Sequence, residues 1–321
     1  AHNGRYMIIL KAIWNNKMKI EKYAAIDIGS NAIRILISNV FILKQKPPLF
    51  LKSSIVRVPV RLGEDSFTSG EISKKSIKMM IRALKAFRLL IKIHQVKDYM
   101  ICATSALRES SNSSSIVKLI KKKLNFNIQI IDGRKEAELI SNNRIFENLN
   151  SINLKNFLFV DVGGGSVEFS LIIKSKKVLS KSFKIGTVRY LNKSIKKRIW
   201  NEIEKWIKSN TKSLSKIYIL GSGGNINKVS KILNIKEGNP LTLLKLKILF
   251  NSLSSLNYQD RMYRYGLNPD RADVILPAIE IFLKVAFWSG ANKIFIPKIG
   301  LSDGIIKELF EKNHNQKLQK L

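Results

Sequence analysis

Cysteine and histidine are scarce in this chain of 321 residues, which has one cysteine, Cys102, and three histidines. A single cysteine excludes an intrachain disulfide framework and a cysteine-based zinc cluster, and it is typical of a reducing compartment. His2, His94 and His314 lie far apart, so no histidine pair has the spacing of a metal site. Runs of about 18 apolar residues are also absent, so we expect no transmembrane helix.

Acidic residues are few as well: 23 Asp and Glu stand against 57 Lys and Arg, which gives a formal net charge of +34. Such an excess indicates a polyanionic partner, and nucleic acid, polyphosphate, a nucleotide or an acidic membrane surface would all qualify. The abundance of Lys, Ile and Asn is equally typical of a biased genome composition. Charge alone therefore does not choose among these interpretations.

The length of the chain favours two domains, because single cores stop growing near ~250–300 residues. We expect residues 1–17 to be a leader or an added segment outside the fold, since clear patterning starts at Met18 and no secretory signal pattern is present. The first domain is predicted to span residues 18–139 and the second residues 140–321. No linker composition separates them, so the boundary is predicted to be a hinge inside packed structure.

Two segments of the chain, residues 23–40 and 157–174, share one design. Each has an apolar run, then Asp-x-Gly, then small polar residues, then a second apolar run, which predicts two strands joined by a tight turn. One copy lies in each half of the chain. The sequence therefore predicts an internal duplication of a strand–turn–strand unit.

Alternating helical and strand patterns between and after these copies indicate an α/β organisation. The predicted elements are a helix over 73–93 with Ser73 as its N-cap, a strand Tyr99–Ala103, a helix over 114–124, a strand Ile128–Ile131, a helix Glu136–Glu147, a helix with isoleucines at 195, 199, 203 and 207, a strand Ile217–Leu220 and a helical tail from about 303. The tail helix is expected to be able to dock back onto the first domain.

Three glycine-rich turns follow predicted strands. They contain Gly29, then Gly163 to Gly165, and then the loop from Gly221 to Asn225. In such turns consecutive backbone N–H groups point into one concavity, which binds phosphate oxygens. Ser30 and Ser166 add small hydroxyl neighbours. One glycine turn would be weak evidence, but three of them, two in duplicated hairpins, favour a phosphate site.

Asp27 and Asp161 each begin a glycine turn at the end of a strand. A carboxylate beside a phosphate cradle repels the ligand unless a hard cation lies between them, and Mg²⁺ binds through one or two carboxylates plus phosphate oxygens. Glu168 follows on the strand that leaves the second turn and could face the same site. The alternative is that these acids only cap the turns through hydrogen bonds.

Polar residues also follow two other predicted strands. The stretch from Thr104 to Arg108 follows one strand, at the edge where ligands bind in open α/β sheets. Glu136 opens the helix after the next strand, where it could be a base, complement the helix dipole or pair with Lys135. We expect the neighbouring Arg134 and Lys135 to favour an ionised Glu136. Arg61 is a weaker phosphate candidate, and neither a Ser-His-Asp triad nor a Walker A sequence is present.

In their order and spacing, these motifs resemble the exopolyphosphatase / guanosine pentaphosphate phosphatase family in its short two-domain form. The resemblance runs from about Lys22 to Leu309. It is carried by the stretches AIDIGSNAIRILI, VRLGE, ATSALRESSN, IIDGRKEAELI, FVDVGGGSVEF, IGTVRYL, GSGGN, NPDRADVILPAIEIF and GLSDGI. Two departures are expected to change substrate contacts: the first Glu of the family's Gly-x-Glu-Glu-Ala motif is Lys135 here, and the third glycine loop ends in Asn225 rather than Thr.

The resemblance implies an actin-like, ribonuclease H-type fold with two related α/β domains around an interdomain cleft. Glu136 matches the family's catalytic glutamate, and Asp161 and Glu168 match positions associated with Mg²⁺ and the catalytic water. The metal candidates are Asp27, Asp161 and Glu168. The phosphate-binding candidates are Gly29, Ser30, Asn31, Arg34, Thr104, Arg108, Gly163, Gly164, Gly165, Ser166, Gly221, Ser222, Gly223 and Gly224.

The activity implied is Mg²⁺-dependent hydrolysis of a terminal phosphoanhydride, either in inorganic polyphosphate or in guanosine pentaphosphate. Mn²⁺ is an alternative cation and potassium an additional one. An ATP-dependent kinase or ATPase of the same superfamily, and a non-catalytic nucleotide- or nucleic-acid-binding protein, remain as alternatives. Nucleic acid is not favoured as a partner, because helix-turn-helix, zinc-finger and RNP signatures are absent. We expect a cytoplasmic protein without a membrane partner, and the resemblance allows a homodimer.

Overall fold

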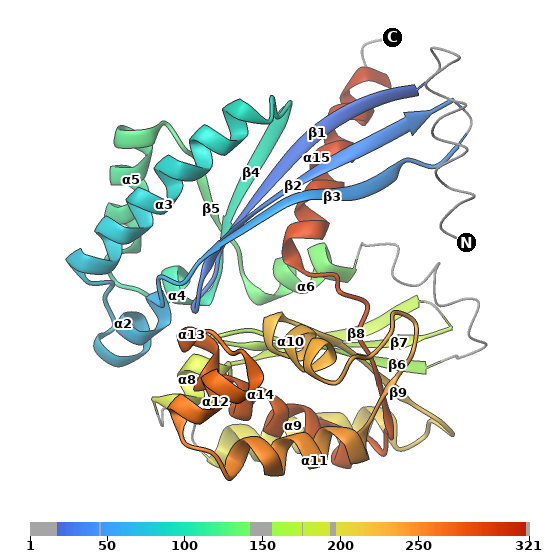
Figure 1. Cartoon of the computed structure of the whole chain (residues 1–321). Helices are drawn as coiled ribbons and strands as arrows, with labels where there is room; N and C mark the ends of the chain where they lie inside the picture. The colour runs from blue at the N-terminus through green and yellow to red at the C-terminus, as the bar shows by residue number, and fades with distance from the viewer. Residues whose placement is uncertain (1–17, 45, 142–155, 175, 193–196, 319–321) are drawn as a thin grey trace.

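The computed structural model describes residues 18–44, 46–141, 156–174, 176–192 and 197–318. In this part of the chain, two lobes each contain one mixed sheet with helices packed against it (Figure 1). No helix of the described residues is both long and apolar enough to cross a membrane.

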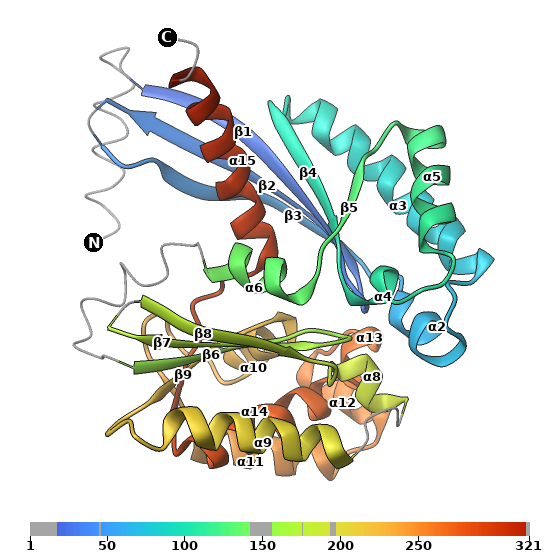
Figure 2. The same cartoon turned by 180° about the vertical axis from the view of Figure 1, so that it is seen from behind.

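The elements of the first lobe lie in the first half of the chain. They are β1 (Met18–Ile28), β2 (Ile33–Leu43), β3 (Leu49–Val58), α2 (Leu62–Ser69), α3 (Lys74–Ile93), β4 (Asp98–Ala103), α4 (Ser105–Arg108), α5 (Ser113–Leu124) and β5 (Ile128–Ile130). The helix α6 (Gly133–Ser141) follows and lies between the lobes (Figure 2).

The second lobe begins with a hairpin and ends with a long helix that leaves it. Its elements are β6 (Asn156–Val162), β7 (Val167–Ile173), β8 (Lys176–Phe183), α8 (Thr187–Leu191), α9 (Lys197–Thr211), β9 (Tyr218–Ser222), α10 (Gly224–Ile232), β10 (Leu241–Thr242), α11 (Leu243–Ser254), α12 (Tyr258–Tyr265), α13 (Pro269–Ala272), α14 (Ile275–Ser289), β11 (Lys293–Phe295) and α15 (Leu301–Leu318).

The predicted duplication is confirmed by the order of the strands. The first sheet has the order β3-β2-β1-β4-β5, and the second contains β8-β7-β6-β9-β11 with β10 added at its edge. In both sheets three antiparallel strands are followed by strands that run parallel to the first. The two hairpins predicted from Asp-x-Gly are β1–β2 and β6–β7, at equivalent places in the two sheets.

The long helix α3 shows how the sequence produces a covering layer. Its apolar residues recur at helical spacing, so that Leu84, Phe87 and Ile91 are buried on one side while lysines and arginines face solvent. The Ser73 side chain accepts a hydrogen bond from the Ser76 N–H at 3.2 Å, so the predicted N-cap is confirmed. Together with α5, this helix covers one face of the first sheet.

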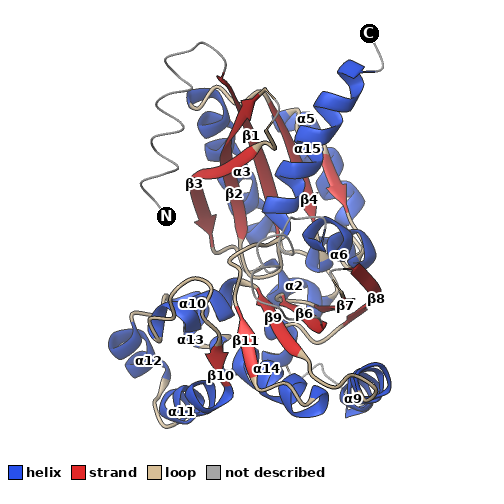
Figure 3. Ribbon diagram, turned by 90° about the vertical axis from the view of Figure 1, so that its right-hand side faces the viewer, coloured by secondary structure: helices blue, strands red, loops and turns tan. Residues whose placement is uncertain are grey.

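The two lobes share a core of their own. Tyr23 and Ala25 of β1, Phe157 and Phe159 of β6 and apolar residues of α15 belong to one buried cluster. The helix α15 returns from the second lobe and packs on β1 and β4, on the face of the first sheet opposite to α3 and α5 (Figure 3). It also crosses α6, where a Cβ at Gly304 would lie 2.0 Å from the Leu139 carbonyl oxygen. This contact requires glycine.

Most element boundaries agree with the sequence prediction within a few residues. The helix predicted at Glu136–Glu147 begins earlier, at Gly133, and is described to Ser141; the rest of the predicted span lies outside the described residues. The tail helix begins at Leu301 instead of 303. The predicted leader, residues 1–17, also lies outside the described residues.

Candidate active site

A cavity of about 190 Å³ lies between the lobes, at the turns that end β1 and β6. Fourteen of the predicted site residues line it: Asp27, Gly29, Ser30, Asn31, Arg34, Thr104, Glu136, Asp161, Gly163, Gly164, Ser166, Ser222, Gly223 and Gly224. Arg108, Gly165, Gly221 and Glu168 are not among its lining residues. Gly221 lies inside β9, where an added Cβ would meet the core residues Ile294 and Phe282.

The first glycine turn is held by backbone hydrogen bonds within the first lobe. The Gly29 N–H donates to the Ala32 carbonyl at 3.1 Å, and the Gly63 N–H donates to the Ser30 carbonyl at 2.8 Å. The Ser30 hydroxyl lies 2.9 Å from that of Ser105, the first residue of α4. The turn is therefore a fixed wall of the cavity before any ligand binds.

The second glycine turn approaches the first so closely that side chains would not fit. A Cβ on Gly164 would lie 2.9 Å from Ser30 Cβ, and a Cβ on Gly165 would lie 2.2 Å from Ser105 Oγ. Arg189 fixes this turn from the other side, since its Nε donates to the Gly165 carbonyl at 2.9 Å. The two glycines thus let the turns of the two lobes meet at one point.

The third glycine loop joins β9 to α10 and places the start of that helix at the cavity. Gly223 has a φ of 111°, a region that favours glycine, and a Cβ there would lie 2.7 Å from the Val162 carbonyl oxygen. The first N–H groups of α10 have no partners within the helix, and backbone N–H groups at such a position bind anions.

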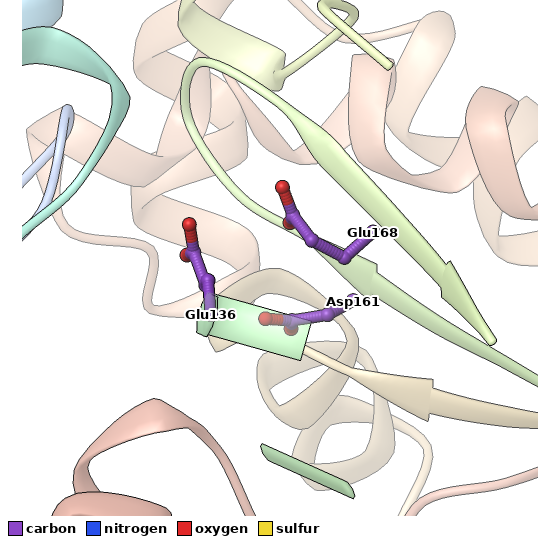
Figure 4. Close-up of side chains that lie close together, drawn as sticks. All are labelled: Glu136, Asp161 and Glu168. Atoms are coloured by element: carbon purple, nitrogen blue, oxygen red, sulfur yellow. The ribbon is translucent and has the colours of Figure 1, made fainter. Parts of the chain in front are cut away.

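Three carboxylates gather beside these turns. Asp161 of β6 and Glu168 of β7 lie directly opposite each other in the hairpin register, and Glu136 comes from the first turns of α6 (Figure 4). One carboxylate oxygen from each lies within 4.8 Å of the other two. Glu136 Oε2 and Glu168 Oε2 are buried without a hydrogen-bond partner. Such oxygens cost free energy unless a cation, a proton or a water satisfies them.

Burial and mutual repulsion change the acidity of this cluster. Burial, followed by the charge of Asp161, raises the pKa of Glu168 to about 7, and burial raises the pKa of Asp161 to about 6. The pKa of Glu136 is also raised well above its usual value, first by burial and then by the charges of Glu168 and Asp161. A bound divalent cation would offset this repulsion and restore the ionised forms.

The expectation that Arg134 and Lys135 keep Glu136 ionised is wrong. The Lys135 ammonium lies 2.7 Å from Glu308 of α15 and 3.6 Å from Glu138, so it points away from Glu136. Arg108 is the cation that lowers the pKa of Glu136, and burial outweighs it. Adjacent residues on a helix face different directions, and this is why sequence neighbours were a poor guide to the charge that Glu136 experiences. Lys135, which stands where the family motif has its first Glu, instead joins α6 to α15 through Glu308.

The remaining predicted cations and acids have identifiable partners. Asp27 does not belong to the carboxylate cluster; its Oδ2 lies 3.7 Å from Arg34 Nε, directly across the first hairpin. Arg108 donates to the Ile131 carbonyl at 2.7 Å. Arg61 donates to Asp273 at 2.7 Å and to Glu64 at 2.6 Å, so it joins the lobes and is not available for phosphate.

Sequence reasoning missed several residues that shape the site. The Ser182 hydroxyl of β8 donates to Glu168 Oε1 at 3.0 Å, and Ser166 donates to the same oxygen at 2.6 Å. Arg57 and Asp270 form a second ion pair between the lobes. The signal for the latter was present, because Asp270 lies in the stretch NPDRAD, but its partner is distant in sequence. The signal that could have identified Ser182 is its position in the third strand of the duplicated unit.

The chemistry of the cluster suits a hard divalent cation. Carboxylate oxygens are preferred ligands of such ions. Glu136, Asp161 and Glu168 bring three carboxylates together, and Glu136 and Glu168 each have one oxygen that lacks a protein donor. The lining of the cavity contains four acids, Asp27, Glu136, Asp161 and Asp303, against the three cations Arg34, Lys52 and Lys298. Added positive charge would therefore favour the binding of an anionic ligand here.

Comparison with known proteins identifies the protein family. The model of the Ppx/GppA phosphatase family matches residues 51–313, and the chain belongs to this family. The predicted resemblance is thereby confirmed.

Three curated relatives are similar over most of this chain. The bifunctional 3-dehydroquinate synthase/phosphatase of Fusobacterium nucleatum is 27% identical and aligns with 92% of the chain and 48% of its own length. The guanosine-5'-triphosphate,3'-diphosphate pyrophosphatase of Aeromonas hydrophila is 23% identical over 91% of the chain and 60% of its own length. The putative exopolyphosphatase of Haemophilus influenzae is 22% identical, with 90% of both chains covered. The chain thus spans about half to three fifths of the first two relatives.

Solved structures confirm the predicted fold class. The crystal structure of an exopolyphosphatase from Cytophaga hutchinsonii superposes with a TM-score of 0.77 at 23% identity, covering 91% of this chain and 98% of the other. The Ppx/GppA family member of Aquifex aeolicus gives a TM-score of 0.70 at 23% identity, covering 92% and 100%. The two α/β lobes therefore have the fold of these Ppx/GppA proteins.

Proposed function

We propose that this chain hydrolyses the terminal phosphoanhydride of a polyanionic phosphate compound and releases orthophosphate. The observation that carries the proposal is a cluster of three buried carboxylates, two of which, Glu136 and Asp161, line one cavity together with glycine turns from both lobes. Glycine turns bind phosphate oxygens, and the carboxylates supply what the turns lack, namely a base and a cation site.

The names of the relatives narrow the substrate class. Relatives of this chain are named exopolyphosphatase or guanosine-5'-triphosphate,3'-diphosphate pyrophosphatase. Polyphosphate and guanosine pentaphosphate both end in a phosphoanhydride, so one arrangement of turns and carboxylates would serve either substrate. The net charge of +34 would favour the approach of such polyanions through a salt-sensitive attraction.

Glu136, Asp161 and Glu168 would hold Mg²⁺ or a similar cation through their carboxylate oxygens. When bound, this cation supplies positive charge that the transferred phosphoryl group requires. The N–H groups of the turns at Gly29, Gly163 and Gly164 would fix the terminal phosphoryl oxygens, which removes orientational freedom before the reaction. Asp27 is a less suitable ligand than predicted, because it faces Arg34 and lies outside the cluster.

Glu136 is the residue best placed to orient water. Its Oε2 is buried at the cavity without a partner, and it is the member of the cluster that comes from α6, outside the hairpin. In phosphoryl transfer the protein mainly positions the nucleophile in line with the leaving group. A carboxylate that hydrogen-bonds to the attacking water orients it and can accept its proton. Burial, followed by the charges of Glu168 and Asp161, raises the pKa of Glu136. A bound cation would restore the carboxylate form that accepts a proton from water.

The test is phosphate release from polyphosphate of defined lengths, guanosine pentaphosphate and ATP, with and without Mg²⁺. We expect release from at least one of the first two, and a loss of roughly 10²–10⁴-fold in turnover for Glu136→Gln. Glu138→Gln is the matched control, since Glu138 lies on the same helix with its side chain 48% exposed. If Glu136→Gln keeps near wild-type turnover, Glu136 is not the base. If only ATP is consumed, and only with an acceptor, the protein is a kinase.

A further inference from the structure

The strand β3 contains an irregularity that turns one lysine toward the cleft. Ile37 of β2 lies opposite Ser54, but the next residue, Ser38, lies opposite Lys52, so Ser53 is an extra residue. Side chains alternate between the faces of a strand, and a bulge shifts this alternation by one position. Without it, Ser53 would face the cleft and Lys52 would point away.

The bulge places Lys52 on the same face of the sheet as Arg34 and Leu36, and all three line the cavity. Arg34 and Ser38 are four residues apart on β2, which corresponds to about 13 Å along the strand. Arg34 pairs with Asp27 at the turns, so Lys52 marks the far end of the cavity. A ligand that reaches both must be longer than one phosphoryl group.

A second lysine lies beside this end. Lys52 Nζ donates to the Lys298 carbonyl at 2.9 Å and lies 2.9 Å from Asp303 Oδ1, which holds the segment before α15 against β3. Lys298 has a φ of 54°, in the left-handed region that is unfavourable for a residue with a side chain. Lys298 is an exposed residue at the cavity, and among the described residues it forms no ion pair.

The lining of the cavity also indicates which kind of ligand extends this far. Nucleobases are commonly held by stacking on aromatic rings. None of the described residues that line this cavity is aromatic, and the apolar ones near Lys52 are aliphatic, such as Leu36 and Ile55. Cations without a stacking surface suit a linear polyanion better than a nucleoside.

We propose that Lys52 and Lys298 form a distal anion subsite, which binds phosphates farther along a linear polyphosphate chain whose terminal group lies at the carboxylates. This inference rests on the proposed function and specifies its substrate. The Lys52–Asp303 pair is partly exposed, with side chains 41% and 20% accessible, so solvent screens it and a phosphate can replace Asp303 at low cost.

The same chemistry would bind the 3'-diphosphate of guanosine pentaphosphate, so the experiment compares sources. The variants are Lys52→Gln, Lys298→Gln and their combination, with Lys293→Gln as the matched control, because Lys293 is exposed on β11 outside the cavity. Lys52→Arg keeps the positive charge, so this variant should bind long-chain polyphosphate as the wild type does. KM and kcat are measured for tripolyphosphate, long-chain polyphosphate and guanosine pentaphosphate, and thermal unfolding checks that each variant is folded.

For each single variant we expect KM for long-chain polyphosphate to rise roughly three- to tenfold with kcat retained, while KM for tripolyphosphate changes less than twofold. In a Glu136→Gln background, calorimetry measures the binding of long polyphosphate at several salt concentrations. The slope of the logarithm of the binding constant against the logarithm of salt concentration should decrease by about one for each lysine removed. Equal effects on short and long chains, or none on either, would overturn the subsite. An effect confined to guanosine pentaphosphate would overturn polyphosphate as its occupant. Absence of phosphate release by the wild-type protein would instead refute the proposed function itself.

Discussion

The two duplicated hairpins differ in charge at the position opposite their aspartate. In β1–β2, Asp27 lies opposite Arg34, and in β6–β7 the equivalent Asp161 lies opposite Glu168. The first hairpin therefore places a cation across from its carboxylate, whereas the second places another carboxylate there. The register is the same in both hairpins, and the residue opposite the aspartate has the opposite charge.

The consequence is a difference in electrostatic compensation. Burial raises the pKa of Asp27, and Arg34 works against this shift. In the second hairpin the pKa of Glu168 is raised by both burial and the charge of Asp161. Unfavourable electrostatics of this kind persist where a ligand is needed to complete a site. We infer that the second hairpin is the half that binds the cation, while the turns of both hairpins bind the anion.

The largest effect should follow from changing the second hairpin. Glu168→Gln keeps the shape of the side chain and removes one of three clustered charges. We expect turnover to fall by roughly 10²–10⁴-fold, while thermal stability in the absence of divalent cations stays equal or rises, because repulsion is relieved. Phosphate release and thermal unfolding are the measurements. A clear loss of stability together with intact turnover would show that Glu168 has a structural role instead.

A smaller effect should follow from making the first hairpin resemble the second. Arg34→Glu would place a carboxylate opposite Asp27, and we expect KM for the polyanion to rise by about tenfold or more with a smaller change in kcat. Arg82→Glu is the matched control, because it makes the same change of charge on the exposed face of α3. If both variants change KM alike, net charge alone matters and Arg34 has no specific role.

The sequence predicted the features that depend on local pattern. The two hairpins, the capped helix after Ser73 and fourteen of the residues that line the cavity follow from periodicity, glycine and the end of a strand. The extent of the cluster could not be predicted, because the approach of Glu136 to Asp161 depends on how α6 packs between the lobes. Charge balance was misjudged for the same reason, since Lys135 pairs with Glu308, which is distant in sequence.

The ion pairs that join the lobes and the bulge in β3 were not predictable either. Arg57 and Asp270 are separated by most of the chain, and their pairing follows from tertiary packing alone. The register shift opposite Ser38 depends on which residues of β2 and β3 face one another. A count of alternating residues in β3 would have assigned Lys52 to the opposite face.

The smallest expected effect concerns Glu21, a carboxylate at the other end of β1, where neighbouring groups outweigh the effect of burial on its pKa. Burial acts to raise the pKa of Glu21, but Lys19, Lys97 and Tyr23 outweigh it, and the pKa is lowered to about 2. A lowered pKa in the folded state contributes stability that is present above the usual value of about 4.5 and is lost as pH falls toward 2.

This contribution is up to about 3 kcal/mol. Glu21→Gln should therefore lower the free energy of unfolding at neutral pH and flatten its decline between pH 5 and pH 2, with turnover unchanged. Urea unfolding at several pH values measures both. Parallel curves for the variant and the wild type would contradict the assignment of this acid-sensitive stability to Glu21.

The most direct test of the central claim is divalent-cation binding itself. Mn²⁺ binding can be followed by electron paramagnetic resonance in the wild type, Glu168→Gln and Arg34→Gln, without substrate. We predict that the wild type and Arg34→Gln bind Mn²⁺ with similar affinity, and that Glu168→Gln binds it at least ~10-fold more weakly, because the ion is held by the carboxylates of the second hairpin and α6. Unchanged binding by Glu168→Gln, or loss of binding in Arg34→Gln alone, would contradict this division between the two hairpins.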